Sequence, residues 1–474
     1  MNQTDKNYSA VDASCRVPLL ALLGGAVLWL VVGLALELIA SLTFHKPDLF
    51  AGCQFLTYGR VLPAANDAIL YGFAIPAALG VILWIFARLS EAELVLPLVP
   101  LAAANILHLG VFIGVIGILI GDSTGFAWLE FPHAGAVLIF IAYVLIAISA
   151  FATFGARRER TLHPAHWFLL AGLFWFPWIY STANLFLVAF PVRGVTQAVI
   201  DWWYCNNLLF VWLGLIGLGV AFYLLTKIAG RGLQGGYYKV FAIWTFLLFA
   251  PWLGMPQTAP IPAWLPGLSF VASALMIFPL IAFGVVYYKT VYGADVQCKG
   301  GPFCYAKFAT VAFLLSAIML LCCGCPDFGR KVGLTWFTQA QVYMQIFGFF
   351  AIVICGAIYD LLAGVMGFEL PFPKFVRFQH WAFMLGVLFL VAPLALGGIL
   401  QGIKMGDASV QFSDIIQGSL VYLRISTLGW FFLLLGSLML AANIFVMTIR
   451  WKLALLKTGI AAVKSPLETE GAKS

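Results

Sequence analysis

The sequence predicts an all-α, polytopic membrane protein of about twelve transmembrane helices in one domain. Of its 474 residues, 63% are hydrophobic and only 9% are charged, and the mean hydropathy is +1.00. A soluble domain could not bury so many apolar side chains, because much of its surface stays in contact with water. Apolar runs of roughly 20 residues, enough to cross a hydrocarbon layer about 30 Å thick, recur from Pro18 to Met447.

The apolar runs set the order of the elements. The first run is longer than the apolar core of a signal peptide and lacks a small-residue cleavage site, so we expect it to be a retained helix. The tail after residue 450 is rich in Lys, Glu, Ser and Gly, which predicts disorder. We therefore expect an N-terminal segment (1–17), a membrane domain (18–450) and a tail (451–474). The expected helices are about 18–44, 61–88, 94–121, 133–155, 165–190, 197–227, 238–258, 264–290, 305–325, 335–365, 377–403 and 416–449.

The basic residues predict the orientation in the membrane. With the N-terminus inside, 19 of the 26 lysines and arginines fall in inner segments and 7 in outer ones. This bias predicts a bacterial inner-membrane protein with both termini in the cytoplasm. The net charge of +7 does not indicate nucleic-acid binding, because no polar basic stretch alternates with aromatic residues.

Four short segments carry a resemblance to a known family. They are LTYGRVLPAAN (56–66), DWWYCNN (201–207), PWLGMPQ with IPAW (251–257 and 261–264), and FTQAQVYMQIFG (337–348). In sequence, order and spacing they resemble subunit I of the haem-copper respiratory oxidases, closest to the cbb3-type cytochrome c oxidase. The resemblance runs from about residue 56 to residue 405 and implies the twelve-helix arrangement of that subunit.

The resemblance also implies where haem ligands would stand. The family has a histidine two residues after the proline of the first segment, and this chain has Ala65 there. Two further histidines, two residues apart on one helix, bind the two haems of the family. Gln341 and Tyr343 occupy those positions.

The copper positions are substituted in the same way. In the family three histidines bind the active-site copper, and the matching positions here are Asn206, Gly254 and Met255. The family also carries a tyrosine cross-linked to a copper ligand, and the corresponding stretch 311–315 (VAFLL) has none. The family would bind two haems and one copper. Because all six ligands are substituted, we expect no haem and no copper in this chain, and no catalytic residue.

Replacement ligands are the alternative. Met255 offers a thioether, Tyr343 a phenolate and Cys205 a thiolate, and each of these groups binds iron or copper in some proteins. A different alternative is a small-molecule cavity where the haems would lie, lined by polar side chains. Its candidate lining residues are Asn206, Asn207, Gln339, Gln341, Tyr343 and Gln345.

Three functions follow from these observations. The first is a non-catalytic paralogue of subunit I that acts as a membrane scaffold or partner subunit in a respiratory electron-transfer complex, together with other membrane subunits and c-type cytochrome subunits. The second is an active terminal oxidase or nitric oxide reductase with unorthodox ligands. The third is a transporter or ion-conducting protein that uses the vacated haem cavities.

Two further groups of residues invite an interpretation. Asp67 lies seven residues after Arg60, two turns along the same helix face, which predicts an ion pair between them. Cys322, Cys323 and Cys325 form a cluster at the predicted outer end of a helix. A metal site, a disulfide to Cys53 and unpaired apolar packing are all compatible with that pattern.

Overall fold

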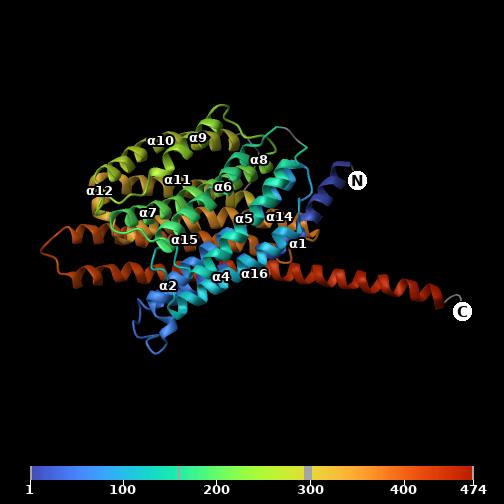
Figure 1. The fold of residues 1–474 in the computed structure, drawn as a ribbon, viewed down its shortest axis with the longest axis horizontal. Coiled ribbons are helices and arrows are strands. Elements are labelled where there is room, and N and C mark those ends of the chain that lie inside the picture. Colours follow the sequence, from blue (N-terminus) through green and yellow to red (C-terminus); the bar gives the residue numbers. More distant parts are fainter. Residues whose placement is uncertain (1–2, 159–160, 293–300, 472–474) are drawn as a thin grey trace.

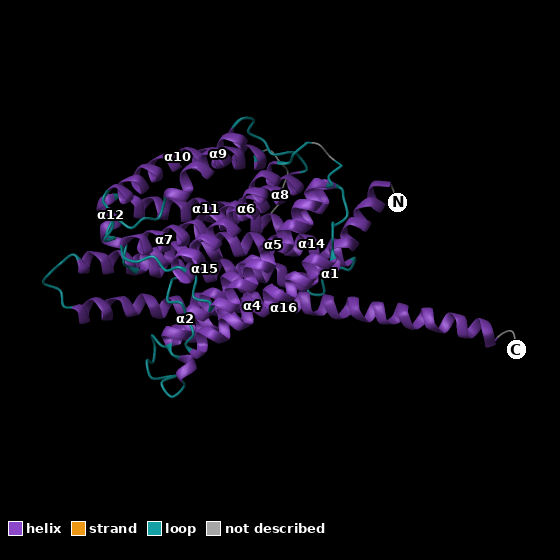
Figure 2. Cartoon of the chain, in the orientation of Figure 1, coloured by secondary structure: helices purple, strands orange, loops and turns teal. Residues whose placement is uncertain are grey.

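The chain folds into a bundle of helices that run side by side (Figure 1). The computed structural model describes residues 3–158, 161–292 and 301–471, and within these ranges every regular element is a helix (Figure 2). The helices are α1 (Gln3–Leu42), α2 (Tyr58–Asp67), α3 (Ile75–Ser90), α4 (Leu98–Ile120), α5 (His133–Gly155), α6 (Pro164–Ala183), α7 (Val195–Asn206), α8 (Leu213–Ala229), α9 (Tyr238–Phe249), α10 (Trp264–Val291), α11 (Pro302–Gly324), α12 (Pro326–Val332), α13 (Trp336–Tyr343), α14 (Ile352–Met366), α15 (Pro373–Met405) and α16 (Phe412–Gly471).

Short 3₁₀ and π-helical turns connect several of these α-helices. The 3₁₀ turns are η1 (Gln54–Leu56) and η5 (Ala250–Trp252), and the π-helical turns are η2 (Ala68–Ala74), η3 (Asn184–Ala189), η4 (Asn207–Trp212) and η6 (Met344–Ala351). Because η2, η4 and η6 join two α-helices end to end, the pairs α2–α3, α7–α8 and α13–α14 each form one continuous membrane span.

Eleven helices in the described ranges are long and apolar enough to cross a membrane, one fewer than the twelve expected. The difference lies in the segment expected at 238–258. There the apolar helix covers only Tyr238–Trp252, because Pro251 lies in the closing 3₁₀ turn and Gly254 has a left-handed backbone (φ +84°) that ends the helical path.

Three spans form the centre of the bundle. The most apolar stretches of Tyr58–Ser90 and Val195–Ala229 are fully buried, and that of Trp336–Met366 is 89% buried, whereas the other spans bury 39–50%. These central spans carry most of the positions that the sequence singled out. Ala65, Asn206 and Gln341 each lie within three residues of a π-helical turn. Such turns are frequent at functional sites, because the extra residue redirects the side chains around it.

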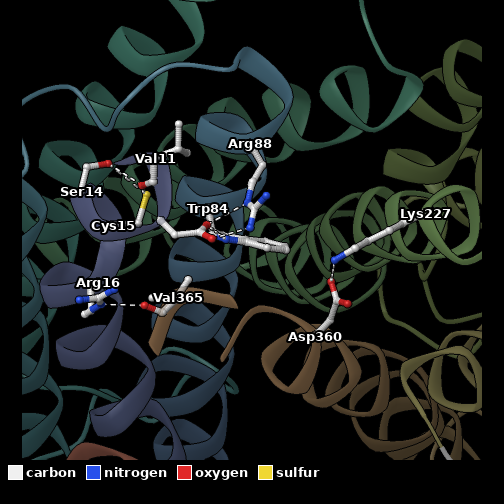
Figure 3. Close-up of polar contacts among 10 residues, drawn as sticks. Val11, Ser14, Cys15, Arg16, Trp84, Arg88, Lys227, Asp360 and Val365 are labelled. Carbon is white, nitrogen blue, oxygen red and sulfur yellow. Dashed lines mark hydrogen bonds and ion pairs between the residues drawn. The ribbon is translucent and has the colours of Figure 1, made fainter. Parts of the chain in front are cut away.

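Ion pairs fasten the helices together at one end of the bundle (Figure 3). Asp12 of α1 accepts hydrogen bonds from Arg88 and from Trp84 Nε1 (3.1 Å), both on α3. Lys227 of α8 pairs with Asp360 of α14 at 2.7 Å. These contacts join α1 to α3 and α8 to α14, and charges placed near helix ends avoid the high cost of burial at membrane depth.

Candidate functional site

A polar cavity of about 330 Å³ lies where α7, the loop after η5, the end of α11 and the start of α13 meet. It brings together four of the positions that the sequence resemblance matches to metal ligands of the family, Asn206, Gly254, Met255 and Gln341, together with Gln339. Other side chains around it include Trp128, Trp202, Cys205, Phe210, Gln257, Cys323 and Thr338. The cavity is therefore the place where the substituted positions could act together.

Asn206 and Gly254 contact each other in this cavity. The Asn206 Nδ2 donates to the Ala250 carbonyl oxygen at 3.0 Å, which fixes the direction of the amide. A Cβ built on Gly254 would lie 2.8 Å from the Asn206 Cβ, and the Gly254 φ of +84° disfavours any side chain. The position that matches a copper-binding histidine of the family therefore has neither the space nor the backbone conformation for a side chain.

Gln341 and Met255 are held in place by buried hydroxyl groups. Gln341 is 7% exposed and donates from Nε2 to Ser316 Oγ at 3.2 Å. Met255 is 8% exposed, and its backbone N–H donates to Ser269 Oγ at 3.3 Å. The hydrogen bond to Ser316 thus orients the Gln341 amide, whereas the bond to Ser269 fixes the backbone of Met255.

Tyr343 and Ala65 lie outside the polar cavity. Tyr343 borders a separate pocket of about 20 Å³ next to Glu37 and Tyr58, and its ring packs edge-on against Trp430, with centroids 4.9 Å apart. Ala65 is fully buried where α1 crosses α2, and a Cβ on Gly33 would lie 3.2 Å from its carbonyl oxygen. Of the three candidate replacement ligands, Met255 and Cys205 share the cavity and Tyr343 does not.

Two of the candidate lining residues have other surroundings. Asn207 Nδ2 donates to the carbonyl oxygens of Trp203 and Pro251, and its Oδ1 accepts from Trp175 Nε1 at 3.1 Å. Its amide therefore links α7 to α6 and η5. Gln345 is fully buried, and neither atom of its amide has a hydrogen-bond partner among the described residues. It is not among the residues that line the polar cavity.

Gln257 and Trp128 were missed as site residues by sequence reasoning. Gln257 donates from Nε2 to the carbonyl oxygens of Pro266 (3.2 Å) and Gly324 (3.0 Å). Trp128 has φ +62°, which is rare for a residue with a side chain, and its carbonyl oxygen accepts a hydrogen bond from Tyr71. Gln257 ends the segment PWLGMPQ, but nothing in that segment marks it as a site residue, and no sequence pattern marks Trp128, because the partners of both are distant in the chain.

The cysteine cluster contains free thiols. Cys322, Cys323 and Cys325 are unpaired, as is Cys53, so the disulfide alternative is wrong. Cys323 lines the cavity and Cys325 is exposed at the end of α11. In the described ranges no three His, Cys, Asp or Glu side chains lie close enough to form a metal site.

A buried acid pair lies near the cavity. Glu130, in the loop between α4 and α5, is 9% exposed, and burial raises the pKa of its carboxyl to about 7. The fully buried Asp67 carboxyl lies beside it. The predicted ion pair between Asp67 and Arg60 is wrong, since Arg60 Nη1 donates instead to the Leu119 carbonyl oxygen at 3.2 Å.

Comparison with known proteins establishes the family. Residues 17–432 match the family model described as cytochrome c and quinol oxidase polypeptide I, so the chain belongs to the subunit I family of the haem-copper oxidases. It is 22% identical to the cbb3-type cytochrome c oxidase subunit CcoN1 of Stutzerimonas stutzeri, over 88% of this chain and 91% of that protein.

Further relatives agree with this assignment. The chain is 22% identical to cytochrome c oxidase subunit 1 of Rhodobacter capsulatus, over 93% of this chain and 86% of that protein. The fold matches a solved haem-copper terminal oxidase dimer with a TM-score of 0.70 at 12% identity, over 94% of this chain and 84% of that one. The expected subunit I arrangement is thus confirmed.

The family membership corrects the expectation about cofactors. From the missing histidines we expected no haem and no copper, but the chain belongs to a family whose subunit I normally binds both. The expectation rested on the sequence resemblance at six positions, and the loss of one ligand set is not the loss of binding.

The residues at the six positions do not form the ligand set of the family. Ala65 and Gly254 have no donor atom, and Tyr343 lies in a different pocket from Gln341. Of the six positions, the cavity holds the Asn206 amide from α7, the Gln341 amide from α13, the Met255 thioether and the backbone of Gly254. We therefore derive no chemical step through haem or copper.

Proposed function

We propose that this chain is a subunit I-type membrane subunit of a respiratory electron-transfer complex that does not itself reduce oxygen. The observation that carries the proposal is the contact between Gly254 and Asn206, where the space and backbone conformation exclude a metal-binding side chain. The proposal concerns turnover and is independent of whether a haem is bound elsewhere in the chain.

A second observation supports the proposal. The helix that carries the catalytic tyrosine in the family has Phe313 in the corresponding stretch, fully buried against Phe210 (centroids 6.0 Å apart) and Phe349 (4.9 Å). A phenyl ring has no hydroxyl proton to give. The reaction of the family requires protons at the bound oxygen, and the stretch 311–315 of α11 has no tyrosine hydroxyl to donate them.

The partners and the location are part of the same proposal. The chain acts in the bacterial inner membrane with both termini in the cytoplasm, next to other membrane subunits that include c-type cytochromes. The relatives that bear the name of a cytochrome c oxidase subunit support such a setting. The test is to isolate the chain from its own membranes in mild detergent and to identify its partners by mass spectrometry.

The same preparation tests the lack of turnover. Oxygen consumption with reduced cytochrome c as the electron donor should not exceed the background measured without protein. Any turnover that is lost when Met255 or Cys205 is replaced would contradict the proposal.

One observation favours a second function. The sulfur-bearing side chains of Met255 and Cys205 line the same cavity, and soft sulfur donors suit copper. The alternative is therefore an active oxidase or nitric oxide reductase with these two residues as ligands. Loss of turnover in Met255→Leu and Cys205→Ala, but not in the exposed Cys325→Ser, would establish it.

A further inference from the structure

Three amide side chains that line the polar cavity share one arrangement, in which the amide nitrogen is hydrogen-bonded to the protein. Asn206, Gln257 and Gln341 each donate through the amide nitrogen to a protein acceptor. For the first two the acceptors are backbone carbonyl oxygens, which can only accept, so the orientation of each amide is fixed by chemistry. Among the described residues nothing donates a hydrogen bond to the amide oxygens of these three side chains.

The cavity has no charged side chain among its lining residues. Its remaining walls are formed mostly by apolar and aromatic side chains, which include Trp128, Trp202 and Phe210, together with the uncharged polar side chains of Thr338 and Gln339. Buried oxygen atoms gain free energy from a donor, whereas a charged group would be buried without a partner at high cost. The cavity therefore favours an uncharged group with hydroxyl hydrogens.

An apolar groove adjoins this cavity. It has a volume of about 310 Å³, and its walls include Trp178, Phe186, Trp252 and Leu268, all of which are exposed on the outside of the bundle. Met255 lines both the groove and the polar cavity. The Met255 side chain thus lies between the polar cavity, which accepts hydrogen bonds, and the apolar groove. In a membrane this groove lies against the lipid chains.

We propose that the cavity and the groove together bind one uncharged amphiphile with a hydroxyl-bearing head. Its hydroxyl groups donate to the amide oxygens of Asn206, Gln257 and Gln341, and its acyl chain passes Met255 into the groove. The absence of cationic residues from the lining disfavours the anionic phospholipids, and the Trp walls match an apolar chain. This inference goes beyond the proposed function and does not depend on it.

A brominated acyl chain tests the proposal, because bromine quenches the fluorescence of tryptophans that it contacts. The probes are 9,10-dibromostearoyl monoglyceride, the methyl ester of the same acid, which accepts but cannot donate, and the free carboxylate. With the purified full chain in detergent, we expect the monoglyceride to bind about tenfold more tightly than the methyl ester, the ratio expected from one or two net hydrogen bonds. We expect the carboxylate to bind most weakly.

Substitutions then locate the head of the probe. Gln341→Met removes one acceptor at nearly constant volume, and we expect the affinity ratio of monoglyceride to methyl ester to fall severalfold. The matched control is Gln417→Met, at an exposed glutamine of α16, which should leave the ratio unchanged. A ratio is used because a misfolded variant would lose both affinities together.

Met255 lines both the cavity and the groove, so Met255→Trp adds bulk where they adjoin and should weaken the binding of the monoglyceride and of the methyl ester. Three results would overturn the proposal. The first is equal affinity for the monoglyceride and the methyl ester, and the second is an affinity ratio that Gln341→Met does not change. The third is that no probe quenches the tryptophan fluorescence because a haem fills the cavity.

Discussion

A Cβ on Gly254 would lie 2.8 Å from the Cβ of Asn206, although the two residues are 48 positions apart in the chain. The sequence resemblance matches each of them to a copper-binding histidine of the family. Asn206 is held by its hydrogen bond to Ala250, and Gly254 turns the chain out of the short helix α9. The two substitutions therefore fit each other, because the left-handed turn at Gly254 brings its backbone into the space beside Asn206.

This contact predicts a local cost for any side chain at Gly254. We expect Gly254→Ala to destabilise the fold by about 1–3 kcal/mol, because it adds a clash and a strained backbone. The measurement is thermal unfolding in detergent. Gly267→Ala is the control, since nothing lies within 4 Å of its added Cβ in α10, and it should be neutral or stabilising. Equal stability of both variants would refute the clash.

The buried Glu130 carboxyl predicts a pH dependence. Its pKa is about 7 in the folded chain, against a usual value of 4.5, because of burial. The folded state therefore binds more protons than the unfolded state between these values, so Glu130 costs stability as the pH rises from about 4.5 to 7. Glu130→Gln should gain thermal stability over the unchanged chain at pH 8, and the gain should vanish near pH 4.5.

The control for this experiment is Glu93→Gln, at an exposed residue between α3 and α4. It should show no gain that depends on pH. A Glu130→Gln variant that is equally stabilised at pH 4.5 and pH 8 would mean that ionisation of this carboxyl is not the cause.

The two ion pairs of Figure 3 differ in burial, which predicts unequal contributions to stability. Asp12 is 7% exposed and Arg88 22%, whereas the exposed fractions are 14% for Asp360 and 44% for Lys227. We expect Asp12→Ala to cost about 3–5 kcal/mol, since it removes a buried carboxylate that accepts hydrogen bonds from both Arg88 and Trp84, and Asp360→Ala to cost about 1 kcal/mol or less.

Unfolding measured for both variants under the same conditions decides between these values. The double variant Asp12→Ala with Arg88→Met should recover part of the loss, because it also removes the positive charge that Asp12 balances. If the double variant is less stable than the single one, the loss of this charge balance is not the source of the cost.

The proposed orientation predicts the accessibility of a thiol. Cys325 is free and exposed at the end of α11, which lies outside the cell if both termini are cytoplasmic. A membrane-impermeant maleimide should label it in intact spheroplasts, and Cys325→Ser should lose that label. A cysteine introduced at Lys452 should react only after permeabilisation. Reversed labelling would show the opposite orientation.

The sequence by itself determined the class of protein, the positions of most membrane spans and the family. Length and apolarity of a run are local properties, and they decide whether a segment can cross a bilayer. Only the segment at 238–258 was misjudged, because the effect of Pro251 and Gly254 on the helix depends on what they pack against. The order of the four motifs was likewise readable, since it is a property of the chain alone.

Only the tertiary structure decided which of the singled-out residues meet. Gln341 and Tyr343, two positions apart, point to opposite sides of α13 as the helix period predicts, but the tertiary structure alone shows that one lines the polar cavity and the other a different pocket. Asp67 lies beside Glu130 of a distant loop instead of Arg60 on its own helix face. Helix period predicts neighbours within one helix, but the π-helical turns redirect side chains and the packing of other elements selects their partners.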